Sequence, residues 1–472
     1  MPTPQAHRRP GRCANPMSSA RAIPMNEEQS ALSMRFPPGF LFGAATSAYQ
    51  IEGAADEDGR APSIWDTFCA VPGAVIHGDT GAIACDHYHR VDADLDLMSA
   101  IGLSAYRFSV AWPRIVPDGT GPVNQKGLDY YRRLLDGLHA RGIEPVATLY
   151  HWDLPQPLQE AGGWANRDTV ARFCDYAQVV LDSLGDLIGR WVTVNEPFCS
   201  AMIGHLEGRH APGIRDLHAA LAAAHHLLLA HGEATARIRA SVPGAQVGIS
   251  HLFSDIRPAS PSAEDQAAAQ RLDGHENRWF LDPVFAGSYP ADMLSWYQNQ
   301  VPIDFIRDGD LQIAATPIDF LGVNYYESKM VAHDPGEPYH QARALPPDGK
   351  LTAGGLDVRA AGLGRVLRRV SGPLFITENG AAFHDYADPE GGVDDLERVN
   401  YLADHFGAAL AAIESGVDLR GFFVWSLLDN FEWADGYSRR FGLVFVDFAT
   451  QARIPKASAR WYQELIAGQA DR

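Results

Sequence analysis

The 472-residue sequence predicts an α/β protein built as a single (β/α)8 TIM barrel. Two observations lead to this fold class. Eight short apolar segments recur along the chain from Phe36 onward, and longer stretches with the apolar spacing of helices separate them. Strands that alternate with helices form a parallel sheet, and eight such units close into a barrel. No linker or shift in composition interrupts residues 36–466, so one domain of this type accounts for the length.

The expected strands are apolar runs of four or five residues. Such runs are typical of strands that are buried on both faces, as in a parallel sheet covered by helices. In chain order they are residues 40–44, 104–108, 145–149, 191–194, 246–249, 320–323, 374–377 and 421–425.

Helices are expected between the strands, where apolar residues recur at the spacing of one helix face. Residues 86–101 show this spacing, and Gly102 then provides a C-terminal cap signal. Residues 170–184 repeat the pattern, as does the stretch from Leu128 to Leu138. These helices would cover the outside of the barrel.

Composition and charge narrow the range of partners. The net charge of −19 at pH 7 would repel the phosphates of nucleic acids and an anionic membrane surface. No apolar run approaches the roughly 18 residues that a membrane span needs. A neutral small molecule is therefore the expected partner, with no nucleic acid and no membrane; a homo-oligomer stays open.

The cysteines and the first residues bear on location. Five scattered cysteines without a Cys-x-x-Cys pair indicate neither a disulfide framework nor a zinc site, so reduced thiols in a cytoplasm are expected. Residues 1–33 carry arginines and prolines but no apolar signal region, and we expect a disordered extension before a domain over 34–468 and a short tail over 469–472. An organellar transit peptide stays open, as does a later start of translation at Met17, Met25 or Met34.

Polar and aromatic side chains stand where the expected strands end. Barrel enzymes place their chemistry at the C-terminal ends of the strands, so these side chains should meet at one mouth. The Gly- and Pro-rich stretches 334–355 and 382–395 follow the sixth and seventh strands and should border that mouth. The strand-end residues are Arg107, His151, Trp152, Asn195, Glu196, Asn324, Tyr325, Tyr326, Glu378, Asn379 and Trp425, with Glu432 and Trp433 just beyond.

Two glutamates among these residues carry the functional prediction. Glu196 stands in Thr-Val-Asn-Glu-Pro at 193–197, and Glu378 stands in Ile-Thr-Glu-Asn-Gly at 376–380. Cleavage of a glycosidic bond needs two carboxyl groups, one to protonate the leaving oxygen and one to trap or stabilise the sugar cation. The pair therefore indicates a glycosidase.

A metal-dependent hydrolase is the less favoured reading of the same strand ends. His151 and His251 are the only histidines at the ends of expected strands, and no His-x-His opens the first strand. His87 and His89 lie two residues apart in an expected helix, where their side chains point apart. No metal and no cofactor are expected.

Eight sequence blocks share the order and strand context of one enzyme family. Any one of them is weak by itself, whereas all of them in this order are specific. The blocks are Phe-Leu-Phe-Gly at 40–43, Gln-Ile-Glu-Gly at 50–53, Tyr-Arg-Phe-Ser at 106–109, His-Trp-Asp-Leu-Pro at 151–155, Thr-Val-Asn-Glu-Pro at 193–197, Asn-Tyr-Tyr at 324–326, Thr-Glu-Asn-Gly at 377–380 and Trp-Ser-Leu-Leu-Asp-Asn-Phe-Glu-Trp at 425–433. Over most of its length the chain thus resembles the family 1 glycoside hydrolases, the β-glucosidases and their relatives.

The resemblance implies roles for individual residues. Glu196 would be the general acid/base, and Glu378 the nucleophile, held in its ionised form beside Arg107 and Tyr326. Hydrogen bonds to the sugar hydroxyls would come from Gln50, His151, Asn195, Glu432 and Trp433. Trp425 would be the platform under the sugar ring, Trp152 and Phe441 would wall the pocket, and Asn324 is grouped with these substrate-binding residues.

The resemblance also implies the reaction. We expect a retaining β-glycosidase, foremost a β-glucosidase, that hydrolyses β-glucosides or cello-oligosaccharides, and hence a role in cellulose breakdown. A carboxylate at Glu432 would repel a 6-phosphate, so the sugar should be unphosphorylated. Galactosyl and fucosyl substrates stay open. The alternatives are a transglycosidase with the same catalytic residues and a non-catalytic sugar-binding homologue, which would tend to lack one of the two glutamates.

Overall fold

The computed structural model of the chain describes residues 17, 32 and 35–470. The predicted extension over 1–33 lies outside these residues except for Met17 and Leu32, and so do the alternative starts at Met25 and Met34. The C-terminal tail is described as far as residue 470, within the last helix.

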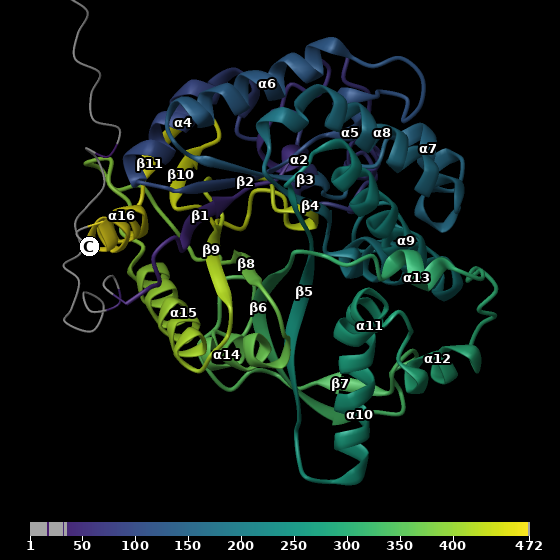
Figure 1. The fold of residues 1–472 in the computed structure, drawn as a ribbon. Helices are drawn as coiled ribbons and strands as arrows, with labels where there is room; N and C mark the ends of the chain where they lie inside the picture. Colours follow the sequence, from purple (N-terminus) through teal and green to yellow (C-terminus); the bar gives the residue numbers. More distant parts are fainter. Residues whose placement is uncertain (1–16, 18–31, 33–34, 471–472) are drawn as a thin grey trace, which may run out of the picture.

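Eight parallel strands form a closed barrel, as predicted (Figure 1). The strands neighbour one another in the order β5, β4, β3, β2, β1, β9, β8, β6, and pairing of β5 with β6 closes the ring. All of these pairs are parallel. Each expected strand has its counterpart: β1 (Leu41–Ala45), β2 (Ala105–Ser109), β3 (Glu144–Tyr150), β4 (Arg190–Asn195), β5 (Gln246–Pro258), β6 (Phe320–His333), β8 (Leu374–Asn379) and β9 (Leu419–Trp425).

Strands β5 and β6 run far beyond their predicted ends. They continue to pair outside the barrel, where Pro258 lies opposite Val331. The short strand β7 (Ala342–Ala344) adds to β6 in the antiparallel sense, within a stretch that was expected to be loop. Figure 1 shows this extended ribbon leaving the barrel beside helix α10 (Ala263–Asp273). The mixed polar composition of residues 250–258 and 324–333 hid these extensions, because only the barrel part of each strand is a continuous apolar run.

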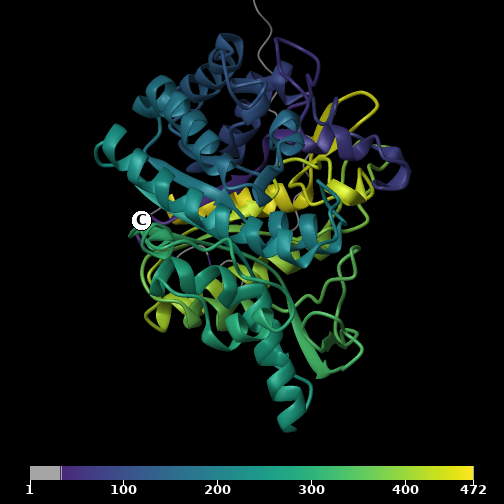
Figure 2. The ribbon, with the colours of Figure 1, turned by 90° about the vertical axis from the view of Figure 1, so that its right-hand side faces the viewer.

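The predicted helices are present and lie around the barrel (Figures 1 and 2). Gly102 caps the helix α4 with a left-handed φ of 88°, as the sequence pattern indicated. The principal outer helices are α4 (His87–Ile101), α6 (Gln125–Ala140), α8 (Asp168–Leu184), α9 (Leu217–Ser241), α14 (Ala360–Arg369), α15 (Leu396–Glu414) and α16 (Ala457–Ala470). Shorter helices lie in the connections: α2 (Ala48–Ile51), α3 (Ile64–Cys69), α5 (Trp112–Ile115), α7 (Gln156–Glu160), α11 (Trp279–Ala286), α12 (Ala291–Gln298) and α13 (Asp310–Ala314). A two-stranded hairpin of β10 (Val444–Asp447) and β11 (Ala452–Pro455) precedes α16.

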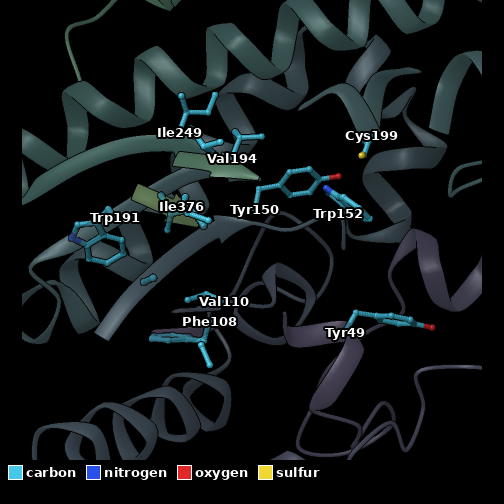
Figure 3. Close-up of a cluster of buried hydrophobic side chains, with 14 of the residues drawn as sticks. Tyr49, Phe108, Val110, Tyr150, Trp152, Trp191, Val194, Cys199, Ile249 and Ile376 are labelled. Carbon is cyan, nitrogen blue, oxygen red and sulfur yellow. The ribbon is translucent and has the colours of Figure 1, made fainter. Parts of the chain in front are cut away.

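Successive residues along the strands point to opposite faces and pack in two different hydrophobic clusters. Val146, Val192 and Phe375 belong to one of them, together with Trp425. Their neighbours along the strands pack in the larger cluster between strands and helices. Figure 3 shows part of that larger cluster, in which Tyr150, Trp152 and Cys199 lie near one another at the C-terminal ends of β3 and β4. Burial on both faces explains why these strands read as continuous apolar runs.

Two further observations concern membranes and thiols. No helix in the described part of the chain is long and apolar enough to span a lipid bilayer. Four of the five cysteines are described, and all four are buried free thiols: Cys69, Cys85, Cys174 and Cys199.

Candidate active site

The two predicted glutamates meet at the C-terminal end of the barrel. Glu378 is the penultimate residue of β8, and Glu196 directly follows β4. Both side chains are buried, and the two carboxyls interact electrostatically. Barrel closure thus brings together two residues that lie far apart in the chain.

Glu378 is surrounded by groups that favour its ionised form. The buried guanidinium of Arg107 donates from Nη1 to Oε1 at 2.6 Å, and the hydroxyl of Tyr326 donates to Oε2 at 2.7 Å. The pKa of Glu378 lies above its ordinary value, because burial outweighs the charge of Arg107 and the hydroxyl of Tyr326, which lower it. The charge-assisted bonds make Glu378 the first of the two glutamates to ionise.

Among the described residues, no cation forms such a bond with Glu196. Its Oε1 accepts a hydrogen bond from Nδ2 of Asn324 at 2.7 Å, and its Oε2 accepts one from the Cys199 thiol at 3.2 Å. Burial and the negative charge of Glu378 raise the pKa of Glu196 to about 8. With Glu378 ionised, Glu196 therefore holds a proton at neutral pH.

A chain of hydrogen bonds joins the two carboxyls. Oδ1 of Asn195 accepts from Nη2 of Arg107 at 2.6 Å and from Nδ2 of Asn324 at 3.1 Å. Arg107 and Asn324 are the partners of Glu378 and Glu196 respectively. Asn195 thereby couples the positions of the two carboxyls, and its own Nδ2 donates to Nε2 of His151 at 3.1 Å.

His151 presents a free donor. Its Nε2 accepts from Asn195, and its buried Nδ1 has no partner among the described residues. Burial, with the charge of Arg107, lowers the pKa of His151 well below its usual value, so the ring is neutral. The proton then resides on Nδ1, which can donate to a ligand.

Aromatic rings surround this donor. The ring of His151 stacks on Trp425 with centroids 5.9 Å apart and an interplanar angle of 17°. Trp152 packs on Trp433 at 4.6 Å. Phe441 belongs to the same cluster as Trp425 and completes the wall.

One oxygen of Glu432, the buried Oε2, is a second polar atom without a protein partner among the described residues. Burial raises the pKa of Glu432 to about 8, with contributions from the charges of Asp435, Glu378 and Glu196. A neutral carboxyl at this position can donate one hydrogen bond and accept others.

Gln50 takes a different position from the other predicted binding residues. Its amide nitrogen donates to Oδ1 of Asn430 at 3.0 Å and to the carbonyl of Phe431 at 2.8 Å, and its oxygen accepts from Ser47 at 2.6 Å. Gln50 therefore holds the segment that carries Glu432 and is absent from the cavity lining. Its contact with a sugar stays a prediction.

The carboxyls open into a cavity of about 280 Å³. Of the predicted residues, Arg107, Asn195 and Asn324 are not among the lining residues, and their hydrogen bonds hold the two carboxyls in place. Nine predicted residues line it: His151, Trp152, Glu196, Tyr326, Glu378, Trp425, Glu432, Trp433 and Phe441.

The outer lining was not predicted. It comes from Phe198, the π-helix Cys199–Glu207 and the residues after it, from the extended parts of β5 and β6, from the π-helix Gly274–Arg278 after α10, and from Leu356. These residues are Phe198, Ile203, Glu207, Arg209, His210, Leu252, Phe253, Ser254, Glu276, Glu327, Lys329 and Leu356. The charged Glu327 and Lys329, directly after Tyr326, were the one signal of this lining in the sequence.

The expectation that stretches 334–355 and 382–395 border the cavity was wrong. The lining contains no residue of either stretch. Ala353 and Ala382 instead pack on the cluster of Trp425 and Phe441, and the backbone N–H of Ala353 donates to the carbonyl of Ala382. The two stretches support the cavity wall from behind, because the longer β5–β6 ribbon occupies the rim.

A close backbone approach explains the glycine of the Thr-Glu-Asn-Gly block. A Cβ atom at Gly380 would lie 1.7 Å from the carbonyl oxygen of Trp425. Only glycine allows β8 and β9 to end this close together. This close approach lies beside Glu378 near the end of β8 and Trp425 at the end of β9.

Histidines, cysteines and acidic residues elsewhere do not gather into a metal centre. Among the described residues, no group of three or more such side chains is arranged to hold a metal ion. The imidazoles of His225, His226 and His231 on α9 are buried and hydrogen-bonded to protein groups.

Fold and site together define a class of protein. A parallel barrel that presents one ionised and one protonated carboxyl at its C-terminal mouth, beside aromatic rings and free polar groups, has the arrangement of a glycoside hydrolase. The model of the family described as "Glycosyl hydrolase family 1" matches residues 32–470. The chain belongs to glycosyl hydrolase family 1.

Individual relatives agree with this assignment. Beta-glucosidase A of Thermotoga maritima is 45% identical over 441 residues, which cover 92% of this chain and 98% of the relative. A bifunctional beta-D-glucosidase/beta-D-fucosidase of Bifidobacterium breve is 42% identical over 466 residues, covering 93% of this chain and all of the relative. The solved family 1 β-glucosidase from Thermotoga maritima superimposes with a TM-score of 0.90 at 44% identity, over 92% of this chain and 99% of that one.

Proposed function

We propose that the protein is a retaining β-glucosidase that hydrolyses terminal, unphosphorylated β-D-glucosyl residues. The observation that carries this proposal is the unequal setting of the two glutamates. Glu378 has Arg107 and Tyr326 as partners for its negative charge, whereas Glu196 has burial and a neighbouring anion, which raise its pKa to about 8. Retaining hydrolysis needs this division between a nucleophile and an acid.

In the first step, the carboxylate of Glu378 attacks the anomeric carbon. The bond from that carbon to the leaving oxygen breaks, and Glu196 delivers its proton to this oxygen. The products are a glycosyl ester on Glu378, a free aglycone and an ionised Glu196.

In the second step, water cleaves the ester. The negative charge on Glu378 is gone in the ester, so the electrostatic contribution that raised the pKa of Glu196 has disappeared. Glu196 takes a proton from water as the water oxygen attacks the anomeric carbon, and Glu378 leaves as a carboxylate. The sugar is released with its original β configuration, because two inversions restore it.

The free polar groups of the cavity support a sugar as ligand. His151 Nδ1 and Glu432 Oε2 are buried without partners in the described chain, and Trp425 offers an aromatic face. The negative charges of Asp435 and Glu378 act on Glu432 and would repel a phosphorylated sugar at this position. Galactosyl and fucosyl substrates stay as alternatives, and the relative from Bifidobacterium breve is named for a fucosidase activity besides its glucosidase activity.

The outer lining supports a leaving group that carries hydroxyls, such as the remainder of a cello-oligosaccharide. It combines apolar side chains with the ion pairs of Lys329 with Glu276 and of Arg209 with Glu207. On this basis we also propose a role in cellulose breakdown. A cytoplasmic location, supported by the buried free thiols, is tested by cell fractionation.

Proton NMR of the first-formed glucose from an aryl β-glucoside tests the proposal. The β-anomer should appear first and then mutarotate, and Glu378→Gly should abolish turnover while the fold stays intact by circular dichroism. Glu397→Gln, at an exposed position on α15, is the matched control and should retain activity. A first-formed α-anomer, or turnover that survives in Glu378→Gly, would contradict the mechanism.

The same spectra distinguish the two alternatives. New disaccharide signals in place of free glucose would indicate a transglycosidase. The aryl β-glucoside, β-galactoside and β-fucoside should each be assayed for binding and for turnover. Binding without turnover of any of the three would indicate a non-catalytic homologue.

A further inference from the structure

The thiol of Cys199 touches the group that we propose as the acid/base, and no step of the mechanism uses it. Its Sγ donates to Oε2 of Glu196 at 3.2 Å, and both residues are 4% exposed. The backbone N–H of Cys199 also donates to the carbonyl of Glu196 at 2.9 Å. Cys199 begins the π-helix that follows the Asn-Glu-Pro block, so the backbone itself holds the thiol against the carboxyl.

The other carboxyl oxygen faces a group that can only donate. Oδ1 of Asn324 accepts from the hydroxyl of Thr377 at 2.6 Å, and this bond orients the amide so that Nδ2 points to Oε1 of Glu196. An oxygen that carries a proton is a weaker acceptor, so a proton on Oε1 would weaken the bond from Asn324. The proton of Glu196 is therefore favoured on Oε2, the oxygen that faces the thiol.

We propose that Cys199 is a positioning residue for the proton cycle of Glu196, an inference that rests on the proposed function. The thiol donates to Oε2 while the carboxyl is ionised, and it turns its S–H away when Oε2 carries the proton. A thiol is a weak donor and a weak acceptor, so it holds the carboxyl in place in both protonation states without strongly favouring either. A permanent donor such as an amide would oppose protonation.

The proposal predicts a small, directed change in pH dependence. Removing the thiol removes a donor to the ionised form, so the pKa of Glu196 should rise. The other groups that act on Glu196 are unchanged in such a variant. They are Glu378 from β8, Arg107 from β2, Asn324 and Tyr326 from β6, and Glu432 after β9.

The test compares pH profiles of the full-length wild type, Cys199→Ala and Cys199→Ser. In Cys199→Ala the basic limb of kcat/KM for cellobiose should move up by about half a pH unit, the size expected for a weak hydrogen bond. The acidic limb of kcat for an activated aryl glucoside, for which water attack is limiting, should move up as well. Cys199→Ser keeps a donor and should return both limbs toward the wild-type positions.

Cys174→Ala is the matched control. Cys174 is likewise a buried free thiol, on the outer helix α8, and the groups that act on its thiol do not include Glu196. This variant creates a comparable cavity and should leave both limbs in place. Unchanged limbs in Cys199→Ala with an active wild type would overturn the positioning role, whereas an inactive wild type would contradict the proposed function itself.

A spectroscopic measurement decides the question if Cys199→Ala does not fold. The S–H stretching band of Cys199, assigned by its loss in Cys199→Ser, is followed in the infrared spectrum of the wild type as pH rises. It should shift to lower frequency as Glu196 ionises and the thiol becomes a donor. A band that stays constant across this titration would overturn the proposal.

Discussion

Three residues of the cavity wall hold backbone conformations that side chains other than glycine seldom adopt. Trp152, Glu196 and Trp433 have φ values of 79°, 44° and 50°. Each such position costs of the order of 1–3 kcal/mol and persists where surrounding contacts determine it. For Trp152 the contact is the bond from its indole nitrogen to the carbonyl of Asn195. The strain thus orients an aromatic wall and a carboxyl toward the same cavity.

Replacement of Glu196 by alanine should separate the two roles of this residue. Substrates with poor leaving groups need its proton, so their kcat/KM should fall by about 10²–10⁴. Activated aryl glucosides form the ester without proton donation and should lose far less in kcat/KM. Steady-state kinetics on cellobiose and on dinitrophenyl β-glucoside measure this difference. Equal losses on both substrates would contradict the acid role, and Glu397→Ala at an exposed position on α15 serves as the control.

The hydroxyl of Tyr326 should set the acidic limb of the pH profile. It donates to Glu378 and lowers the pKa of that carboxyl, so Tyr326→Phe should raise this pKa. Nucleophilic attack needs ionised Glu378, and the acidic limb of kcat/KM should therefore move up by about one pH unit.

The adjacent tyrosine is a matched control for this prediction. The hydroxyl of Tyr325 donates to the carbonyl of Arg359, away from Glu378. Tyr325→Phe should leave the acidic limb where it is. If Tyr326→Phe also leaves it unchanged, Arg107 alone sets the ionisation of Glu378.

A buried ion network connects the elements that support the cavity. Lys456, before α16, donates to Asp385 at 2.5 Å and to Asp429 at 2.6 Å, and all three side chains are nearly inaccessible. Asp429 lies in the segment between Trp425 and Glu432 and also binds Arg440. The network thus links the loop after β8, the segment after β9 and the C-terminal helix. Asp429 belongs to the block at 425–433 but does not line the cavity. Its ion pairs give it a role in holding this block in place.

Lys456→Met should destabilise the fold by about 3 kcal/mol, because it leaves an unbalanced buried negative charge. Urea unfolding followed by circular dichroism measures the change. The double variant Lys456→Met, Asp385→Asn should recover part of the loss, since it removes a negative charge as well. Lys126→Met, at a side chain that is 69% exposed, is the control and should have little effect. Equal stability of Lys456→Met and wild type would show that the network contributes nothing net.

Strand and helix patterns were predictable because they depend on local periodicity. All eight barrel strands and the helices over 86–101, 128–138 and 170–184 were found. The β5–β6 ribbon was missed, because its residues beyond the barrel are mixed in polarity and only the barrel part of each strand is a continuous apolar run. The outer cavity lining was missed as a consequence. Leu252, Glu276 and Lys329 meet there only through this ribbon and the π-helix Gly274–Arg278 after α10.

Seven histidines, six of them buried and His210 half-buried, make the stability of the whole protein depend on pH. Burial lowers each of their pKa values, to about 4 or about 3, from the ordinary 6.5. They are His205, His210, His226, His231, His251, His275 and His405. The folded state keeps them neutral while the unfolded chain protonates them, so their stabilisation is present above pH 6.5 and is lost as pH falls below it. Glu196, Glu432 and Asp153, whose pKa values burial raises to about 8, act in the opposite direction and are fewer.

The protein should therefore unfold cooperatively near about pH 5, well above the pKa of ordinary carboxyls. Each excess proton taken up on unfolding contributes about 1.4 kcal/mol per pH unit, and several together exceed a net stability of about 5–15 kcal/mol within roughly two units. Circular dichroism across pH measures this transition. His231→Gln should shift it to lower pH, whereas the exposed His139→Gln should not. A fold that persists at pH 3.5 would contradict the prediction.

The sequence by itself determined the barrel and the position of both glutamates in it. Periodicity is local, and a residue that directly follows a strand of a parallel barrel lies at the C-terminal mouth of the barrel. The resemblance implied which glutamate holds the proton, and only the tertiary structure supplied the physical reason, because that depends on burial and on partners from other strands: Arg107 and Tyr326 for Glu378, Asn324 for Glu196. The tertiary structure likewise placed the Cys199 thiol against Oε2 of Glu196 and bonded the amide of Gln50 to Asn430 and Phe431. Charge and hydrogen bonding act through space, and chain spacing does not encode them.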